Sequence, residues 1–135
     1  ERPFRSTEDL VDTVHRAKRR RREGRVDSAT RVFQALRIEV NQELDELRRL
    51  LDQVHRLLDQ DGRLVIISYH SLEDRLVKHT LRKRARGEVD PVTGRPKEET
   101  RLLELLTRKV VRPSEAEVTS NPRARSAKLR AARRL

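Results

Sequence analysis

The stretch GRLVIISYHSLEDRLVK, residues 62–78, decides the fold of this 135-residue chain. Its four consecutive β-branched or leucine residues, Leu64 to Ile67, predict a strand over 63–69 that is buried on both faces. A long helical pattern precedes the strand and ends at Asp61-Gly62, with the glycine expected in the left-handed position. A helix, a glycine turn and a buried strand together indicate a parallel sheet in an α/β fold.

A further helix is predicted directly after this strand. Ser71, followed three residues later by Asp74, matches the pattern of a capping box and predicts the start of the helix. The expected buried stripe consists of Leu72, Leu76, Val77 and Leu81.

Amphipathic helices are also predicted before the strand. Residues 7–22 form the first, capped by Ser6 or Thr7. Residues 28–58 carry the strongest helical pattern in the chain, with Asp27 or Ser28 as the cap. This pattern fits either one long helix or two helices with a bend near Asn41.

The remainder of the chain predicts short elements. Residues 86–100 are rich in Gly, Pro and charge and predict a loop. Residues 102–111 predict a strand, although their Leu-rich start also fits a helical turn. Pro113-Ser114-Glu115 opens a short turn or helix, and the alternation over 127–131 predicts a half-buried edge or hairpin strand. Three strands are too few for a doubly wound domain, so we expect the carboxyl-terminal part of a larger α/β protein. A first residue other than Met agrees with that expectation.

Composition excludes several classes of function. The chain has no Cys, which removes disulfides, thiolate zinc sites and a cysteine nucleophile. It has one Tyr, two Phe and no Trp, which disfavours an aromatic platform for single-stranded nucleic acid. No apolar run is long enough to span a membrane and no signal-peptide pattern is present, so a cytoplasmic location is expected.

The net charge of +11 is concentrated in two clusters. Residues 16–25 and 121–135 each carry a net charge of +6, and the rest of the chain is nearly neutral. Local basic clusters are typical of proteins that bind a polyanion such as nucleic acid. The alternative is a general preference for Arg in the composition.

The motif YHSLEDR, residues 69–75, is the main candidate site. It lies where the predicted strand ends, and open α/β sheets bind ligands at the carboxyl ends of their strands. The candidate pocket-lining residues are His70, Ser71, Glu73 and Asp74. The ordinary interpretation is that these residues only cap the helix. Neither a hydrolytic triad nor the spacing of metal ligands is present, so no metal is expected.

The motif NPRARSAKLRAARR, residues 121–134, is a candidate phosphate-binding segment. Arg123, Arg125, Lys128 and Arg130 are expected to project from it, and guanidinium groups match phosphates well. A solvated edge strand protected by its charges is the alternative.

Three motifs together closely resemble one protein family. They are TRVFQALRIEVNQEL (30–44), GRLVIISYHSLEDRLVK (62–78) and RPSEAEVTSNPRARSAKLR (112–130). Their order and spacing are similar to the carboxyl-terminal half of the bacterial small-subunit rRNA cytosine-N(4) methyltransferases, the RsmH or MraW family. The resemblance covers residues 7–134.

The resemblance implies an α/β fold, the carboxyl-terminal part of a Rossmann-type methyltransferase that carries an inserted helical domain. Residues 1–28 would end the inserted substrate-recognition domain, and 29–135 would belong to the core, with 86–100 as a variable loop. The family uses S-adenosylmethionine to methylate the exocyclic N4 amine of a cytosine in the decoding region of 16S rRNA. The cofactor loop of the family is absent from this sequence, so no cofactor-binding residue is expected here and the fragment alone is expected to be inactive.

The implied partner is 16S rRNA in the small ribosomal subunit, and a homodimer is left open. His70, Ser71, Glu73 and Asp74 would line the pocket or orient the base. The expected rRNA-binding residues are Arg37, Asn41, Arg75, Arg123, Arg125, Lys128 and Arg130. Two alternatives remain: a basic rRNA- or ribosome-binding module without catalysis, and an oligomerisation segment built on the 39–60 helix.

Overall fold

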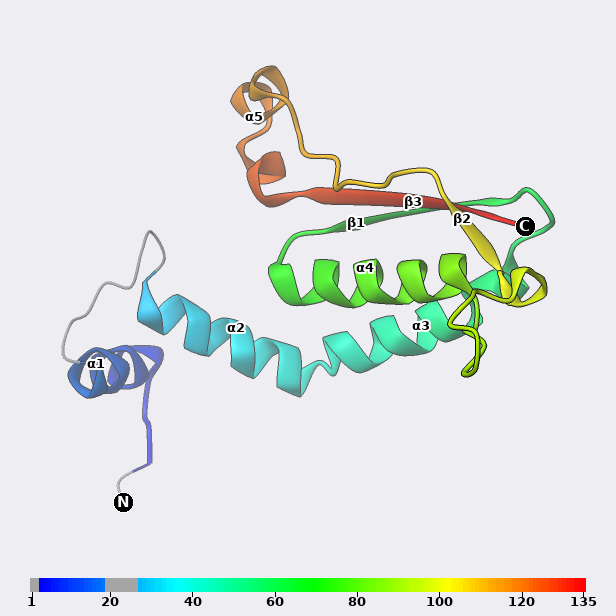
Figure 1. Ribbon diagram of the computed structural model, residues 1–135. Coiled ribbons are helices and arrows are strands. Elements are labelled where there is room, and N and C mark those ends of the chain that lie inside the picture. Colours follow the sequence, from blue (N-terminus) through cyan, green and yellow to red (C-terminus); the bar gives the residue numbers. More distant parts are fainter. Residues whose placement is uncertain (1–2, 19–26) are drawn as a thin grey trace. The chain divides into compact units, whose positions relative to one another are not determined.

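The computed structural model describes residues 3–18 and 27–135 (Figure 1). Most of the predicted basic cluster at 16–25 therefore lies outside the described residues. Contacts divide the chain into two compact units, Glu1–Glu43 and Leu44–Leu135. The domain boundary expected near residue 28 stays a prediction.

The first unit contains α1 (Thr7–Ala17) and α2 (Ser28–Val40). Ser6 caps α1 by accepting a hydrogen bond from the Asp9 amide, and Asp27 caps α2 by accepting one from Ala29. One of the two cap residues predicted for each helix is thus confirmed.

The long apolar pattern forms two helices, as one of the two alternatives predicted. α2 ends at Val40, and α3 (Glu43–Leu57) begins after Gln42, whose φ of 51° interrupts the helical path. Leu51 and Val54 on α3 are buried within the second unit. The segment 39–60 is thus not one continuous helix, and Leu50 and Leu57 on α3 remain 48% and 68% exposed, so its role in oligomerisation stays a prediction.

The sheet lies in the second unit and has three strands: β1 (Arg63–Ser68), β2 (Leu103–Leu105) and β3 (Lys128–Arg134). Their order is β1-β3-β2, and β3 is antiparallel to both neighbours. The strand predicted over 127–131 as an edge or hairpin strand is present, but its predicted place at an edge was wrong, because β3 is the central strand. The predicted parallel partner for β1 is also absent among the described residues, where β1 pairs only with β3.

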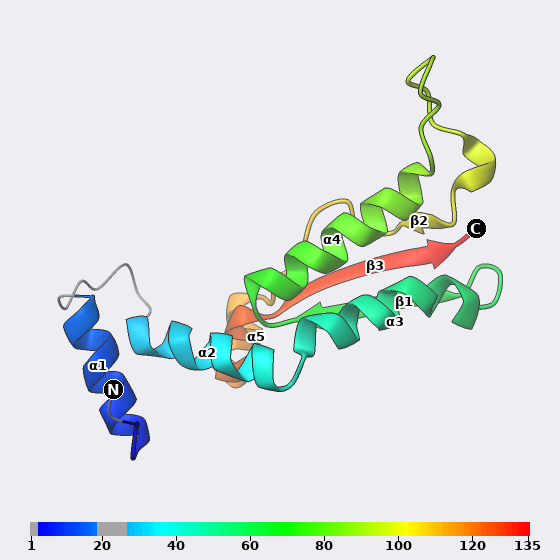
Figure 2. The same ribbon diagram turned by 90° about the horizontal axis from the view of Figure 1, so that it is seen from below.

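Helices α3 and α4 (Ser71–Arg86) lie on the same face of the sheet (Figures 1 and 2). The core between them is formed by Leu51, Val77, Leu81, Leu103 and Ala132, with Leu64 and Ile66 packed against it. On the other face of β1, Val65 and Ile67 remain 56% and 53% exposed. The expectation of a strand buried on both faces is therefore wrong for this chain.

The turn before β1 differs from its prediction in one residue. α3 ends at Leu57, and Asp61, not Gly62, takes the left-handed conformation with φ of 63°. Gly62 is required for space, because a Cβ there would lie 2.7 Å from the Asp59 carbonyl oxygen. This tight turn places the start of β1 beside the end of α3.

The connections after α4 contain short regular pieces. The predicted 86–100 loop holds a small hairpin closed by the Val89–Pro96 bridge and a 3-10 turn, η1 (Glu98–Thr100). The predicted 102–111 strand is regular only over β2. α5 (Glu115–Ser120) begins after the Ser114 cap, as predicted, and η2 (Pro122–Ser126) leads into β3. No helix among the described residues is long and apolar enough to cross a membrane.

Candidate functional site

The candidate site is the junction between β1 and α4. β1 ends at Ser68 and α4 begins at Ser71, so the motif lies at the carboxyl end of a strand, as predicted. The cap of α4 is His70, not Ser71. Its partner in the capping box is Glu73, not Asp74, so the predicted box is wrong by one residue.

His70 and Glu73 hold each other in place. The Glu73 amide donates to His70 Nδ1 at 3.3 Å, and Glu73 Oε2 accepts from the Tyr69 and His70 amides at 3.1 and 3.3 Å. Because Nδ1 accepts a hydrogen bond, the proton of the neutral ring lies on Nε2, 3.3 Å from Glu73 Oε1. Both side chains are thus part of the structure of the junction.

Asp74 points away from this box toward the sheet. Its carboxylate accepts two hydrogen bonds from Arg130 of β3, at 2.7 and 3.2 Å. The side chains are only 17% and 10% exposed. The hydrogen bond from Arg130 holds the pKa of the Asp74 carboxyl below its ordinary 3.8, although burial acts in the opposite direction. The pair fastens the first turn of α4 to the central strand.

Two polar side chains of the junction remain accessible. Ser71 is exposed in the first turn of α4, and Tyr69 is 57% exposed just before the cap. Tyr69 offers an aromatic face on which a base could stack and a phenol that donates or accepts hydrogen bonds. It was not among the predicted site residues, although it is the only tyrosine of the chain and lies directly beside them.

The expected rRNA-binding residues fall into different environments. Arg37 and Asn41, in the first unit, both donate to Glu43 at 2.8 to 3.2 Å. In the second unit Lys128 donates to the Ser126 carbonyl, and Arg130 is engaged by Asp74 as described above. Arg75, Arg123 and Arg125 are exposed in the second unit, and Arg37 and Asn41 are exposed in the first. Their role in binding rRNA stays a prediction.

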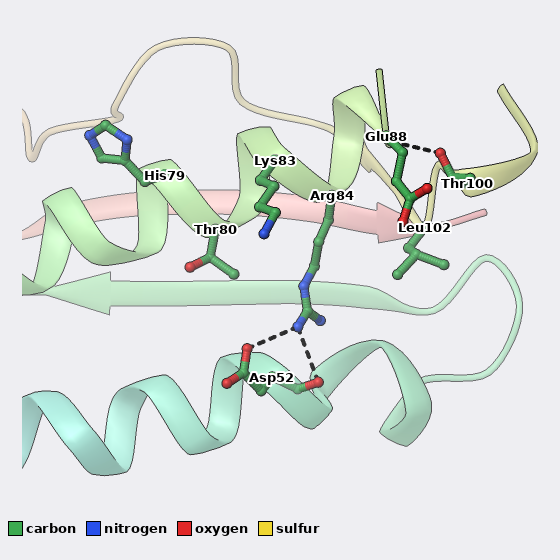
Figure 3. Close-up of a pocket in the computed structure, with 9 residues that line it drawn as sticks. Asp52, His79, Thr80, Lys83, Arg84, Glu88, Thr100 and Leu102 are labelled. Atoms are coloured by element: carbon green, nitrogen blue, oxygen red, sulfur yellow. Dashed lines mark hydrogen bonds and ion pairs between the residues drawn. The ribbon is translucent and has the colours of Figure 1, made fainter. Parts of the chain in front are cut away.

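A cavity of about 460 Å³ lies between α3, the carboxyl-terminal half of α4 and the following loop (Figure 3). Arg84 reaches across it from α4 to Asp52 on α3, donating to the backbone oxygen at 3.1 Å and to the carboxylate at 3.2 Å. Arg84 also contacts His55 Nδ1 at 2.6 Å. Burial and then the charge of Arg84 lower the pKa of His55. The sequence did not predict this cavity, because it depends on contacts between distant segments.

Comparison with known proteins identifies the relatives of the chain. The family described as "MraW methylase family" matches residues 1–135. Three similar curated proteins, each named "Ribosomal RNA small subunit methyltransferase H", come from Dehalococcoides mccartyi, Synechococcus elongatus and Thermomicrobium roseum. They are 47%, 47% and 50% identical over 99%, 100% and 98% of this chain. The alignments cover 39%, 40% and 41% of those proteins, so the chain spans about two fifths of their length.

Proposed function

Because the chain belongs to the MraW methylase family, we propose that it is the carboxyl-terminal part of an rRNA methyltransferase. The proposed reaction is methylation, with S-adenosylmethionine, of the N4 amine of a cytosine in the decoding region of 16S rRNA. The observation that carries the proposal is 46–50% identity, over nearly the whole chain, to proteins named as small-subunit rRNA methyltransferases. The proposed site of action is the small ribosomal subunit in the cytoplasm.

The sheet supports placement in a larger Rossmann-type domain. β1 stands at one edge of the sheet, and beyond it no strand pairs with it among the described residues. Its uncovered face carries Val65 and Ile67, apolar side chains that a complete α/β domain would bury. We therefore propose that β1, β3 and β2 continue a sheet whose other strands lie in the rest of the protein, and that α1 ends an inserted helical domain.

The junction does not fit the cofactor itself. A carboxylate that holds a ribose must be free to accept hydrogen bonds, but Asp74 is bound by Arg130 and Glu73 by two backbone amides. We therefore assign no cofactor ligand to this junction, and propose that the cofactor is held by the rest of the protein. The residues of the junction serve the base to be methylated.

Positioning is the chemistry that these residues can supply. The lone pair of a cytosine amine is delocalised into the ring, so the base must be held in one orientation for transfer to occur. The base must also leave its stack, and the exposed ring of Tyr69 offers a new stacking surface. The Ser71 hydroxyl lies two residues further on and can accept a hydrogen bond from the amine.

The test is methyl transfer by the full-length protein. Purified protein and S-adenosylmethionine carrying a labelled methyl group are incubated with small subunits from cells that lack the modification. Label is expected on one cytosine N4 of 16S rRNA, and the 135-residue chain alone is expected to transfer none. Absence of label with the full-length protein would favour the second candidate, a non-catalytic rRNA-binding module, which the net charge of +11 supports. The fold gives no support for a homodimer.

A further inference from the structure

The exposed surface of α4 is almost entirely basic. After Leu72, every exposed residue of this helix is an arginine, a lysine or a histidine. We call this surface the α4 basic face; it consists of Arg75, His79, Arg82, Lys83 and Arg86. The two acidic residues of the helix, Glu73 and Asp74, are turned to the junction and to β3 and do not contribute to it.

The α4 basic face has no ionic role within the fold. None of its five side chains forms an ion pair or a side-chain hydrogen bond with another part of the chain that the structure describes. Arg84, on the inner side of the same helix, differs in this respect because Asp52 and His55 engage it. Like charges four residues apart on a helix, such as Arg82 and Arg86, destabilise it. The helix dipole favours Lys83 and Arg86 in the last turn of α4, but the described fold supplies no anion to any cation of this face, which is therefore open to an external one.

The shape of the face fits an extended anion. From Arg75 to Arg86 the helix rises about 16 Å at 1.5 Å per residue. Near its carboxyl-terminal end, His79 and Lys83 also line the 460 Å³ cavity, together with the hydroxyl-bearing Thr80 and Thr100 (Figure 3). The cavity also contains the carboxylates of Asp52 and Glu88, and the Thr100 hydroxyl donates to the Lys97 carbonyl, so the row of cations on the helix, and not the hollow, fits the anion.

We propose that the α4 basic face binds phosphates of the rRNA backbone. The identity of the anion rests on the proposed function, whereas the face itself rests on the structure. A membrane surface fits less well, because helices that bind membranes place large apolar residues beside their cations and here only Leu72 is apolar. Contacts to phosphates carry no sequence information, so this face would orient the RNA while the junction acts on the base.

The test compares two triple variants of the full-length protein. Arg82→Gln/Lys83→Gln/Arg86→Gln removes three charges from the α4 basic face and leaves the β1–α4 junction intact. The control Arg56→Gln/Arg63→Gln/Arg95→Gln removes three exposed charges elsewhere, and these side chains also have no partner among the described residues. Affinity for deproteinised 16S rRNA is measured as a function of salt, and thermal unfolding checks that both variants fold.

The binding constant K falls as the salt concentration rises. Removing one cation that binds a phosphate should make the slope of log K against log salt concentration less steep by about 0.7. For three such cations this corresponds to roughly 50-fold weaker binding at 0.15 M salt in the α4 variant. The control is expected to keep the slope of the wild type. Equal affinity in the α4 variant, or an equal decrease in the control, would overturn the inference.

Methyl transfer in the same preparations separates the two proposals. If the wild type transfers no methyl group but the α4 variant still loses affinity and salt dependence, the proposed activity fails and the α4 basic face stands. If the wild type methylates small subunits and the α4 variant binds RNA unchanged, the activity stands and the assignment of this face is wrong. Specific loss of binding to vesicles of anionic lipid, with RNA binding unchanged, would also contradict it.

Discussion

At the scale of single residues, the pair Asp74–Arg130 joins α4 to the central strand through two hydrogen bonds between largely buried side chains. Breaking a buried pair by removing one charge leaves the other unpaired, which costs about 3 kcal/mol. Asp74→Asn is therefore expected to lower the free energy of unfolding, measured in urea, by about that amount. Asp61→Asn is the control, because its partner Arg133 lies at 2.9 Å but both side chains are more than a third exposed. Its effect should stay below about 1 kcal/mol.

The Asp74 carboxyl makes the free energy of unfolding depend on pH, and the direction follows from its pKa. The pKa of Asp74 is lower in the folded chain than its ordinary 3.8. The folded state therefore favours the charged form, and the stabilisation is fully present above pH 3.8 and is lost as the pH falls through the folded pKa. The difference in unfolding free energy between wild type and Asp74→Asn should shrink in urea titrations below pH 3.8. A difference that stays constant from pH 7 to pH 3 would contradict this.

Tyr69 tests the role of the junction in binding the base. Tyr69→Ala removes the exposed ring and is expected to reduce kcat/KM for methyl transfer by roughly 10-fold or more, since stacking on one base contributes about 1–3 kcal/mol. Tyr69→Phe keeps the ring and should retain most of the activity. If the two variants behave alike, stacking is not the function of this side chain.

At the scale of elements, the end of α4 depends on a close approach of backbone and side chain. Gly87 has φ of 73°, and a Cβ there would lie 2.5 Å from Thr100 Oγ1 and 2.9 Å from the Lys97 carbonyl oxygen. Gly94 has nearly the same φ, 67°, with nothing within 4 Å. Both alanine variants carry the backbone strain, but Gly87→Ala adds a clash and should cost at least about 1 kcal/mol more in thermal unfolding. If the two variants are equally destabilised, the segment around Lys97 and Thr100 must move to accommodate the new Cβ without loss of stability.

Most elements could be predicted from the sequence because their signals are local. Helical spacing and caps such as Ser6 and Asp27 act within a few residues, and the structure confirms them. The position of β3 could not be predicted, because a central strand is defined by partners far along the chain. The alternation of small or apolar residues with cations over 127–131 suggested an edge or hairpin strand, but in the structure three successive residues, Arg130, Ala131 and Ala132, are all buried.

In the candidate site, too, the local features could be predicted from the sequence and the long-range contacts could not. Its place at the end of β1 follows from the local motif and is confirmed. The cap residue was misplaced by one position, because an imidazole that accepts from the backbone was not considered. Arg130 was expected to bind phosphate, but its partner Asp74 lies 56 residues earlier and only the fold brings them together.

At the scale of the whole molecule, the uncovered face of β1 makes a prediction about the rest of the protein. Val65→Thr/Ile67→Thr should change the stability of the 135-residue chain little, since both side chains are more than half exposed. In the full-length protein the same variant is expected to lose about 2 kcal/mol or more, because the face would there be buried. Val92→Thr, at a side chain 91% exposed, is the control and should be neutral in both. Thermal unfolding of the two proteins measures the difference.

The central position of β3 also has a consequence for biosynthesis. β1 pairs with β3 across a separation of 60 to 70 residues, and β2 pairs with nothing else in the described sheet. While the ribosome makes this protein, β1, α4 and β2 emerge before the strand that joins them. Until residues 128–134 appear, β2 therefore has no partner in this sheet and β1 lacks its partner on the β3 side, and long-range pairing of this kind is slow. A premature stop shortly before residue 128 would leave a product without the strand that joins β1 and β2, and such a product is prone to aggregation and proteolysis.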